Sequence, residues 1–437
     1  MITVTLERSL CAARATMRGS AMREAAAALL SLCMCGCGAQ SNPQRPNVTG
    51  PVVYAQPGQT VMQAIDNLPS DGGTVILGPG SWSSGYNGTF ITRPNIAIQG
   101  SGMPGYNADF TAMVGGTIIL GPLVASTGAD YFTVRDLGVD AGLNFITNSN
   151  GGVATDALVI FNYGYVVGAP PVQSPLIENV SCLGSSPAAQ FHCMLITNVN
   201  HAYVHNVETV MNCHGLVLKG TNSTVDGVLA RGHGIDSVIL KGEAFAPVSQ
   251  DTLSNITIEP LRSLGDTKGI VVIGVGGPVS GITISKVVIQ APLSWGLNVQ
   301  GESQETSVSG LTLDDISIDY PGGSPANEYC MQFVQFVSNV NINRLSCSNM
   351  WAGIAPYLPD PASFSNFMVT GSQFANIATD AIQTYGSWSI FNDIFNSVRG
   401  NAIVNSSGVT AVGGDFFINI AGGDMLSDGG TFITQTP

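Results

Sequence analysis

The sequence is poor in charge, and above all in positive charge. Asp, Glu, Lys and Arg make up only 10% of its 437 residues, and 15 Lys and Arg stand against 29 Asp and Glu, for a net charge of −14. Proteins that bind nucleic acid present a basic surface, so this composition argues against DNA or RNA as a partner. Beyond the N-terminus, no run of 18 or more uncharged apolar residues occurs, and the sequence therefore predicts no transmembrane helix.

Cysteine spacing excludes the usual zinc motifs. The five cysteines beyond Cys37 show no C-x-x-C pair, and they are Cys182, Cys193, Cys213, Cys330 and Cys347. In an exported protein Cys182–Cys193 and Cys330–Cys347 are candidate disulfides, while buried free thiols fit the sequence equally well. Composition is even along the chain, without linkers between blocks, which predicts a single folded domain.

The first 37 residues have the pattern of an export signal. Arg18 and Arg23 precede a short apolar stretch, residues 25–34, which is too short to span a bilayer. The segment Cys35-Gly36-Cys37-Gly38 is similar to the lipobox of bacterial lipoproteins, with Cys37 as the lipidated residue. We expect residues 1–37 to be signal peptide and lipobox, 38–51 a tether and 52–437 the folded domain. The protein is then an outer-membrane or cell-surface lipoprotein, or is secreted, and membrane contact is expected only through the lipid.

A short pattern recurs along the chain at a spacing of 22 residues, and at longer spacings later. Each unit opens with a polar or large residue, continues with a small one, and then forms a segment whose alternate positions are mostly apolar. Alternation of this kind buries one face of a β-strand. The residues that open these units are Asp156, His192, His214, Asp236, Lys268, Trp295 and Tyr329.

A second signature lies between these segments, in which two apolar residues flank a bend-prone polar pair. Val204-His205-Asn206-Val207 and Val225-Asp226-Gly227-Val228 are examples, and each indicates a corner between strands. A 22-residue unit of this kind cannot bury itself alone, whereas stacked units bury a continuous core. The sequence therefore predicts an all-β, right-handed parallel β-helix of about 9–11 coils. Thr60 is expected to cap a short helix over residues 61–68 at its N-terminal end.

The N-terminal part of this domain resembles a known family. Residues 59–69 (QTVMQAIDNLP), 72–82 (GGTVILGPGSW) and 91–102 (ITRPNIAIQGSG) are similar to the opening of the pectate-lyase-like superfamily, in its "pectate lyase superfamily protein" branch. The resemblance implies a single-stranded parallel β-helix that acts on carbohydrate. Gly232-His233-Gly234 resembles the GHG motif of the more distant polygalacturonases, but the order of Asp and His over successive coils differs. Their mechanism is therefore not carried over.

Stacking in register would place the opening residues in one column, with about 4.8 Å between neighbours. Cations, aromatic rings and amides suit a sugar chain that carries carboxylates, because they neutralise charge, stack on sugar rings and bond hydroxyls. A purely structural interpretation, in which polar corner residues satisfy the backbone, stays open. The residues expected to bind a polysaccharide or oligosaccharide are Asp156, His192, Lys219, His233, Lys268, Trp295, Asn298, Gln300 and Tyr329.

Four residues are predicted to be catalytic: Asp236, His214, Lys241 and Glu243. In a lyase, a base removes the proton beside a uronate carboxyl, and Lys241 or Lys219 would share that work with His214. In a hydrolase, Asp236 and Glu243 would be the two carboxylates that flank the bond.

The sequence leaves other functions open. A non-catalytic glycan-binding or structural surface protein and a fructan- or epimerase-type enzyme are the alternatives. No cofactor is predicted; Asp236, Glu243, Asp251 and Asp266 leave calcium open without supporting it. Oligomeric state is not indicated.

Overall fold

The protein is described here by a computed structural model, which describes residues 50–85, 88–141, 146–147, 153–154, 156–160, 169–184, 192–211, 214–244, 246–260, 268–321, 327–357 and 363–435. The chain divides into two units, residues 1–45 and 46–437, and all described residues belong to the second. The predicted signal peptide and Cys37 lie outside the described residues and stay predictions. Across the described ranges, no helix has both the length and the apolar character needed to cross a membrane.

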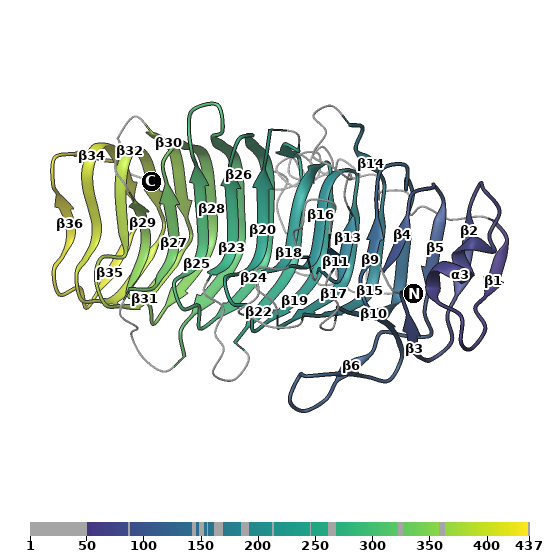
Figure 1. Ribbon diagram of the computed structural model, residues 1–437. Helices are drawn as coiled ribbons and strands as arrows, with labels where there is room; N and C mark the ends of the chain where they lie inside the picture. The colour runs from purple at the N-terminus through teal and green to yellow at the C-terminus, as the bar shows by residue number, and fades with distance from the viewer. Residues whose placement is uncertain are drawn as a thin grey trace, which may run out of the picture. The chain divides into compact units, whose positions relative to one another are not determined.

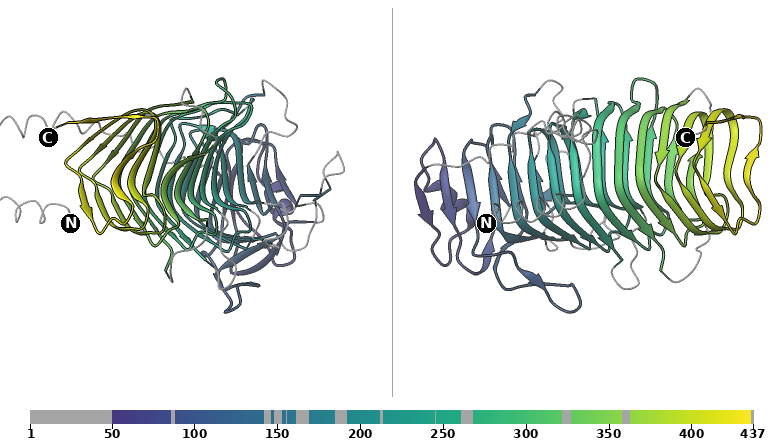
Figure 2. Two further views of the ribbon diagram at one scale, coloured as in Figure 1. Left: turned by 90° about the vertical axis from the view of Figure 1, so that its left-hand side faces the viewer. Right: turned by 180° about the vertical axis from the view of Figure 1, so that it is seen from behind.

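The second unit is a parallel β-helix, as the repeat predicted. Thirty-three strands form one continuous sheet, and every pairing within it is parallel. Strands follow one another in chain order along the stack, from β1 (Val52–Tyr54) at one end to β36 (Gly423–Ser427) at the other (Figure 1). Seen from the C-terminal end, the coils lie one behind another, and the view from behind shows the same order on the far side (Figure 2). The fold prediction is confirmed.

One ladder of strands, here called the site sheet, carries the residues that open the repeats. Thirteen described strands belong to it, against the 9–11 coils expected from the sequence. They are β4 (Thr89–Ile91), β9 (Leu123–Ala125), β13 (Leu158–Ile160), β16 (His192–Asn200), β18 (His214–Thr221), β20 (Asp236–Gly242), β23 (Lys268–Gly274), β25 (Trp295–Gly301), β27 (Tyr329–Val334), β29 (Ala352–Tyr357), β32 (Ile382–Phe391), β34 (Asn401–Gly413) and β36.

A second ladder carries the corner signature. Within each of its strands one residue of the polar pair adopts positive φ, for example Asp136 at 58°, Asn206 at 50° and Gly227 at 75°. Asn, Asp and Gly tolerate this left-handed conformation best, which is why the bend-prone pair marks the corner. The ladder includes β10 (Thr133–Asp140), β15 (Leu176–Leu183), β17 (Tyr203–Val210), β19 (Thr224–Arg231), β22 (Thr252–Glu259), β24 (Val279–Gln290), β26 (Val308–Asp319) and β28 (Val337–Ser348).

The remaining parts of the fold are short. The N-terminal helix α3 spans Val61–Asp66, and Thr60 and Gln63 form its capping box. It is shorter than the predicted 61–68 because Asn67 ends it just before Pro69, yet Leu68 is still buried. Two antiparallel pairs stand apart from the parallel sheet: β6 (Gly105–Tyr106) with β7 (Met113–Val114), and β11 (Ile146–Thr147) with β12 (Val153–Ala154).

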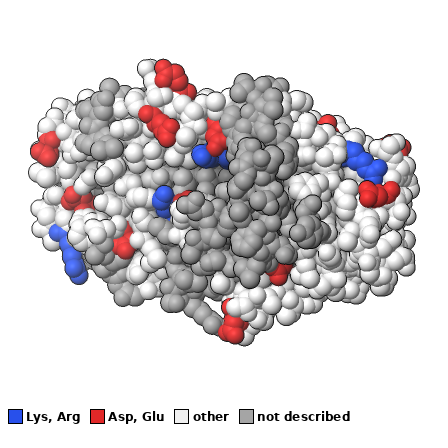
Figure 3. All heavy atoms as spheres, viewed as in Figure 1, with Lys and Arg blue, Asp and Glu red and all other residues white. Residues whose placement is uncertain are grey.

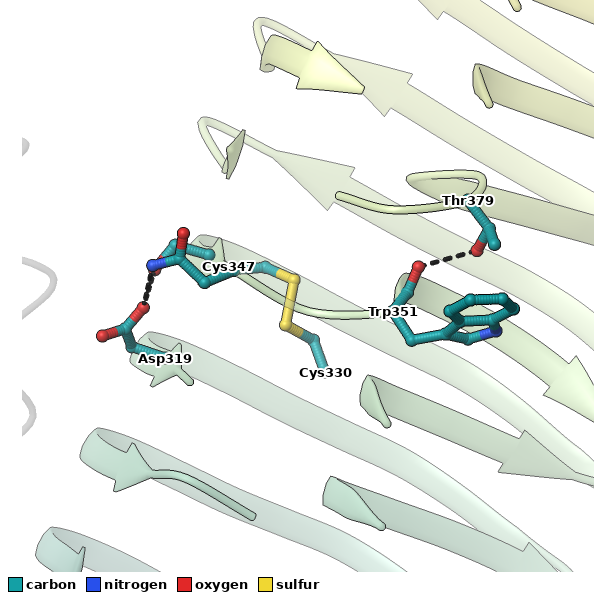
Figure 4. The surroundings of a disulfide bond; sticks show 7 residues. Asp319, Cys330, Cys347, Trp351 and Thr379 are labelled. Atoms are coloured by element: carbon teal, nitrogen blue, oxygen red, sulfur yellow. Dashed lines mark hydrogen bonds between the residues drawn. A yellow bond between two sulfur atoms is a disulfide. The ribbon is translucent and has the colours of Figure 1, made fainter. Parts of the chain in front are cut away.

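Apolar side chains that point inward from every coil form one core. One of the two candidate disulfides is present: Cys330 of β27 and Cys347 of β28 are joined inside this core, with 6.0 Å between their Cα atoms (Figure 4). Cys182 and Cys193 are buried free thiols instead, and each contacts the other's backbone carbonyl. Cys213 lies outside the described residues.

Candidate functional site

The structure brings the residues that open the repeats into register on the site sheet. His192 pairs with His214, His214 with Asp236, and Asp236 with Lys268. The series continues from Lys268 to Trp295 and from Trp295 to Tyr329. The predicted column is therefore a feature of the fold.

Side chains along this line contact one another without a break. Asp156 Oδ1 lies 3.1 Å from His192 Nδ1, and the rings of His192 and His214 stack with centroids 5.0 Å apart and planes 19° apart. His214 Nδ1 is 3.1 Å from Asp236 Oδ2, and Asp236 Oδ1 is 3.6 Å from Lys268 Nζ. Lys268 Nζ in turn lies 4.9 Å from the centre of the Trp295 ring. We call Asp156, His192, His214, Asp236 and Lys268 the polar column.

The two carboxylates of the polar column differ in what they bond. Asp156 Oδ1 accepts the backbone N–H of His192 at 2.7 Å, so it completes a turn. The equivalent backbone N–H beside Asp236, that of Lys268, donates to the carbonyl of Ile235 at 2.9 Å instead. Asp236 Oδ1 makes no hydrogen bond among the described residues, although the side chain is only 7% exposed. Burial of a carboxylate that no backbone group needs is costly, and such groups gather at functional sites.

A second charged group lies at the other end of the same strands. Lys219 Nζ and Lys241 Nζ both bond Glu243 Oε1, at 2.9 and 3.0 Å, while Glu243 Oε2 is buried without a hydrogen bond in the described structure. Burial raises the pKa of Glu243, but the two ammonium groups, Lys219 first, outweigh burial and leave that pKa below its usual range. Burial lowers the pKa of Lys219 despite the bond to Glu243. We call these three residues the lysine clamp.

The four residues predicted to be catalytic are thus divided between two places. His214 and Asp236 lie in the polar column, whereas Lys241 and Glu243 lie in the lysine clamp. Asp236 is the first residue of β20 and Lys241 the last but one, and five residue steps along the extended strand separate them by roughly 16 Å. Glu243 is farther still along the chain, so the structure does not bring it to Asp236 as the second carboxylate of a hydrolase.

The other carboxylate of the column does not supply this partner either. Asp156 and Asp236 are three coils apart, about 14 Å at the usual spacing between strands. Hydrolases place their two carboxyl groups within about 9.5 Å of each other. Neither Glu243, the partner predicted from the sequence, nor Asp156 is therefore placed to act with Asp236 in two-carboxylate hydrolysis.

Between the polar column and the lysine clamp, the outward face of the site sheet is apolar. Val217, Ile239 and Val271 form a buried cluster at the middle position of β18, β20 and β23. On the next two coils the same position holds Asn298 and Gln332, whose side chains bond at 3.2 Å. Gln300, predicted to bind sugar, follows Asn298 two positions later on β25 and is half-buried. Among the described residues on the face shown in Figure 3, charged side chains are scattered and do not gather in one patch.

The five histidines of the chain, His192, His201, His205, His214 and His233, do not share one site. His192 and His214 are in the polar column, whereas His205 contacts Asp226 at 3.3 Å on the second ladder and His201 is exposed. His233, predicted to bind substrate, is fully buried, and its Nε2 lies 3.0 Å from the Thr209 hydroxyl. His233 therefore lies buried beside Gly215, and it is not exposed as a substrate-binding residue would be.

The described residues do not form a recognisable metal site. Across the described ranges, no group of three or more His, Cys, Asp or Glu side chains is arranged to hold a metal ion. Asp266, one of the four carboxylates left open for calcium, lies outside those ranges.

Comparison with known proteins shows the fold. No family profile matches the chain, and no curated protein is similar to it in sequence. Among solved structures, the catalytic domain of a GH87 alpha-1,3-glucanase in complex with tetrasaccharides matches with a TM-score of 0.57 and 13% identity, over 89% of this chain and 68% of that one. The A-module of the Azotobacter vinelandii mannuronan C-5 epimerase AlgE6 matches with a TM-score of 0.52 and 14% identity, over 86% and 94%.

These likenesses define the class of the protein as a parallel β-helix. At such low identity they carry no more than the fold. The narrower resemblance to the pectate-lyase-like superfamily stays a prediction.

Proposed function

We propose that this protein is a carbohydrate-active enzyme that cleaves a polysaccharide at the polar column. The observation that carries the proposal is Asp236: a buried carboxylate, not used by the backbone, held between His214 and Lys268. The structural neighbours support it, since one is described with tetrasaccharides and another as a mannuronan epimerase.

Elimination at a uronate is the chemistry that fits these groups best. Nδ1 of His214 faces Asp236, so Nε2 of the same ring points away from the carboxylate and can take a proton. Asp236 orients the ring and stabilises the imidazolium that forms, as a carboxylate does beside a catalytic histidine. Lys268 places a positive charge near the anion that develops when the proton leaves.

The lysine clamp supports an anionic substrate. It holds two ammonium groups and one carboxylate, which leaves a net positive charge in an acidic protein. We propose that it attracts a uronate carboxylate of the sugar chain some distance from the reacting residue. Trp295 and Tyr329 extend the polar column with rings suited to stacking on sugars. Export, with or without lipid at Cys37, is part of this proposal.

A non-catalytic glycan-binding or structural protein is the second candidate. One observation favours it: at the same corner of a later coil, Asp380 Oδ1 accepts the Asn401 N–H at 2.7 Å, so a carboxylate here can be purely structural. Under this alternative the polar column stabilises the coils and turns over no substrate.

A panel of uronate-containing and neutral glycans separates the two. Wild-type protein is assayed for unsaturated product by ultraviolet absorbance and for new reducing ends, beside D236N and H214Q. The matched control is H205Q, because His205–Asp226 is a similar pair outside the site sheet. We expect turnover that D236N and H214Q lose and H205Q keeps. Binding without turnover, unchanged in all variants, would establish the second candidate.

A further inference from the structure

The polar column contains two carboxylate–histidine pairs in opposite order. Asp156 lies at Nδ1 of His192, and Asp236 lies at Nδ1 of His214, with the two imidazoles stacked between the carboxylates. Each Nδ1 therefore lies 3.1 Å from a carboxylate oxygen, as a hydrogen bond for His192 and as an ion-pair contact without hydrogen-bond geometry for His214, and each Nε2 is directed elsewhere. Two such groups side by side are what a reaction needs when one proton is removed and another is delivered.

We propose that His192 is the second acid–base residue of the reaction, with Asp156 as its positioning residue. This inference rests on the proposed function. The sequence predicted only substrate binding for both residues. Here His214 is assigned as the base, because Lys268 lies on its side of the column, beside Asp236, where negative charge develops. His192 is assigned as the acid that protonates the leaving oxygen.

The proposed step is an elimination that balances without any oxidant or reductant. Neutral His214 takes the proton from the carbon beside the uronate carboxyl. The electron pair of that C–H bond is first held as an anion delocalised into the uronate carboxyl, and it then forms a C=C bond as the C–O bond of the glycosidic link breaks. The departing oxygen takes a proton from the His192 imidazolium. His214 ends protonated and His192 neutral, and exchange with water restores both.

The placement of the two rings also sets the stereochemistry. His192 and His214 project from adjacent strands of one sheet, so both approach a bound sugar from the same side. Removal and delivery of protons on one side give a syn elimination. Inversion at a carbon needs a donor on the opposite face, so we expect no epimer of the substrate.

Deuterium exchange separates the two roles. The full-length protein and its variants are incubated with the uronate polymer on which the wild type is active, in deuterated water, and both product and deuterium in unreacted polymer are measured. We expect H192Q to form product at least about 100-fold more slowly while deuterium still enters the polymer, since His214 continues to remove the proton. H214Q loses both signals, and H205Q behaves as wild type.

D156N provides a second test that spares the turn. Asn keeps an oxygen that accepts the His192 N–H, so the coil is retained while the charge beside the imidazole is lost. We expect slower product formation with exchange preserved, and an unchanged thermal midpoint. The inference is overturned if H192Q cleaves at the wild-type rate, if H192Q loses exchange together with product, or if the wild type yields reducing ends without unsaturated product. Absence of any wild-type turnover would instead overturn the proposed function.

Discussion

The same corner of the β-helix is used in two ways in two regions of the molecule. In the last coils Asp380 caps the backbone of Asn401, and its carboxylate serves the fold. In the middle coils the backbone N–H beside Asp236, that of Lys268, donates to the Ile235 carbonyl. The Asp236 carboxylate faces the side chains of His214 and Lys268 instead. The comparison teaches that residue type and position do not separate a structural acid from a candidate catalytic one. Asp380 and Asp236 differ in whether a neighbouring backbone N–H takes a carboxylate oxygen, and Asp156 combines both uses, because its Oδ1 accepts the His192 N–H and also contacts the His192 ring.

The largest effect should come from exchanging these two carboxylates for neutral groups. D236N is expected to lower kcat by about 10²- to 10⁴-fold with little loss of stability, because it removes the group that orients His214. D380A should leave kcat unchanged and lower the free energy of unfolding by about 1–3 kcal/mol, since the half-buried N–H of Asn401 loses its acceptor. Steady-state kinetics and urea unfolding measure both. Equal kinetic losses in the two variants would end the distinction.

Buried acids near the corners offer a second comparison between the same two regions. Asp251 and Asp393 each accept a serine N–H at 2.6 Å, and burial raises the pKa of each to about 7. A raised pKa means that the folded state prefers the protonated acid. The stability from each group is therefore complete below about pH 4 and is lost as the pH rises toward 7.

Stability should accordingly fall between pH 4 and pH 7, by an amount on the order of a few kcal/mol for each acid. D251N and D393N should each flatten part of this slope, because neither ionises. Urea unfolding at a series of pH values measures it. If the free energy of unfolding of the wild type rose between pH 4 and pH 7, and both variants showed the same pH dependence as the wild type, the raised pKa values of Asp251 and Asp393 would be contradicted.

The disulfide marks a further difference between regions, because Cys330 and Cys347 are joined whereas Cys182 and Cys193 are not. The C330S/C347S double variant should lose about 2–4 kcal/mol of unfolding free energy, since the bond closes a loop of 17 residues that is otherwise open in the unfolded chain. C182S/C193S is the matched control, and reducing agent should lower its stability as much as it lowers that of the wild type. Insensitivity of the wild type to reducing agent would be the contrary result.

The smallest effect is expected at the lysine clamp. K241M leaves Glu243 bonded to Lys219, so the fold should be kept while the net positive charge is lost. We expect KM for uronate polymers to rise a few-fold, on the order of 1 kcal/mol of lost attraction, with kcat unchanged. K286M, which removes a lysine from a distant corner, is the control. If K241M lowered kcat and K286M did not, the reaction would have to take place near the lysine clamp and not at the polar column.

Much of the fold was predictable because the spacing of 22 residues fixes the register directly. The positions of His192, His214 and Asp236 in one column follow from it, as do the corners at residues such as Asn206 and Gly227. Four features were not predictable. All four depend on backbone direction and side-chain reach, which periodicity does not encode. They are the use of the Ile235 carbonyl as an acceptor, the direction of the His233 side chain, the bridging of two lysines by Glu243 and the Asn298–Gln332 hydrogen bond.

The corners have a consequence for how the length of the coils can vary while the site sheet keeps its register. Because a single left-handed residue makes each bend, the number of residues between successive bends is not fixed. Trp295 and Tyr329 are 34 positions apart in sequence, yet they lie directly side by side, as His192 and His214 do across 22. Segments can thus be lengthened, shortened or transplanted at the edges of the coils while the row of reactive groups keeps its alignment.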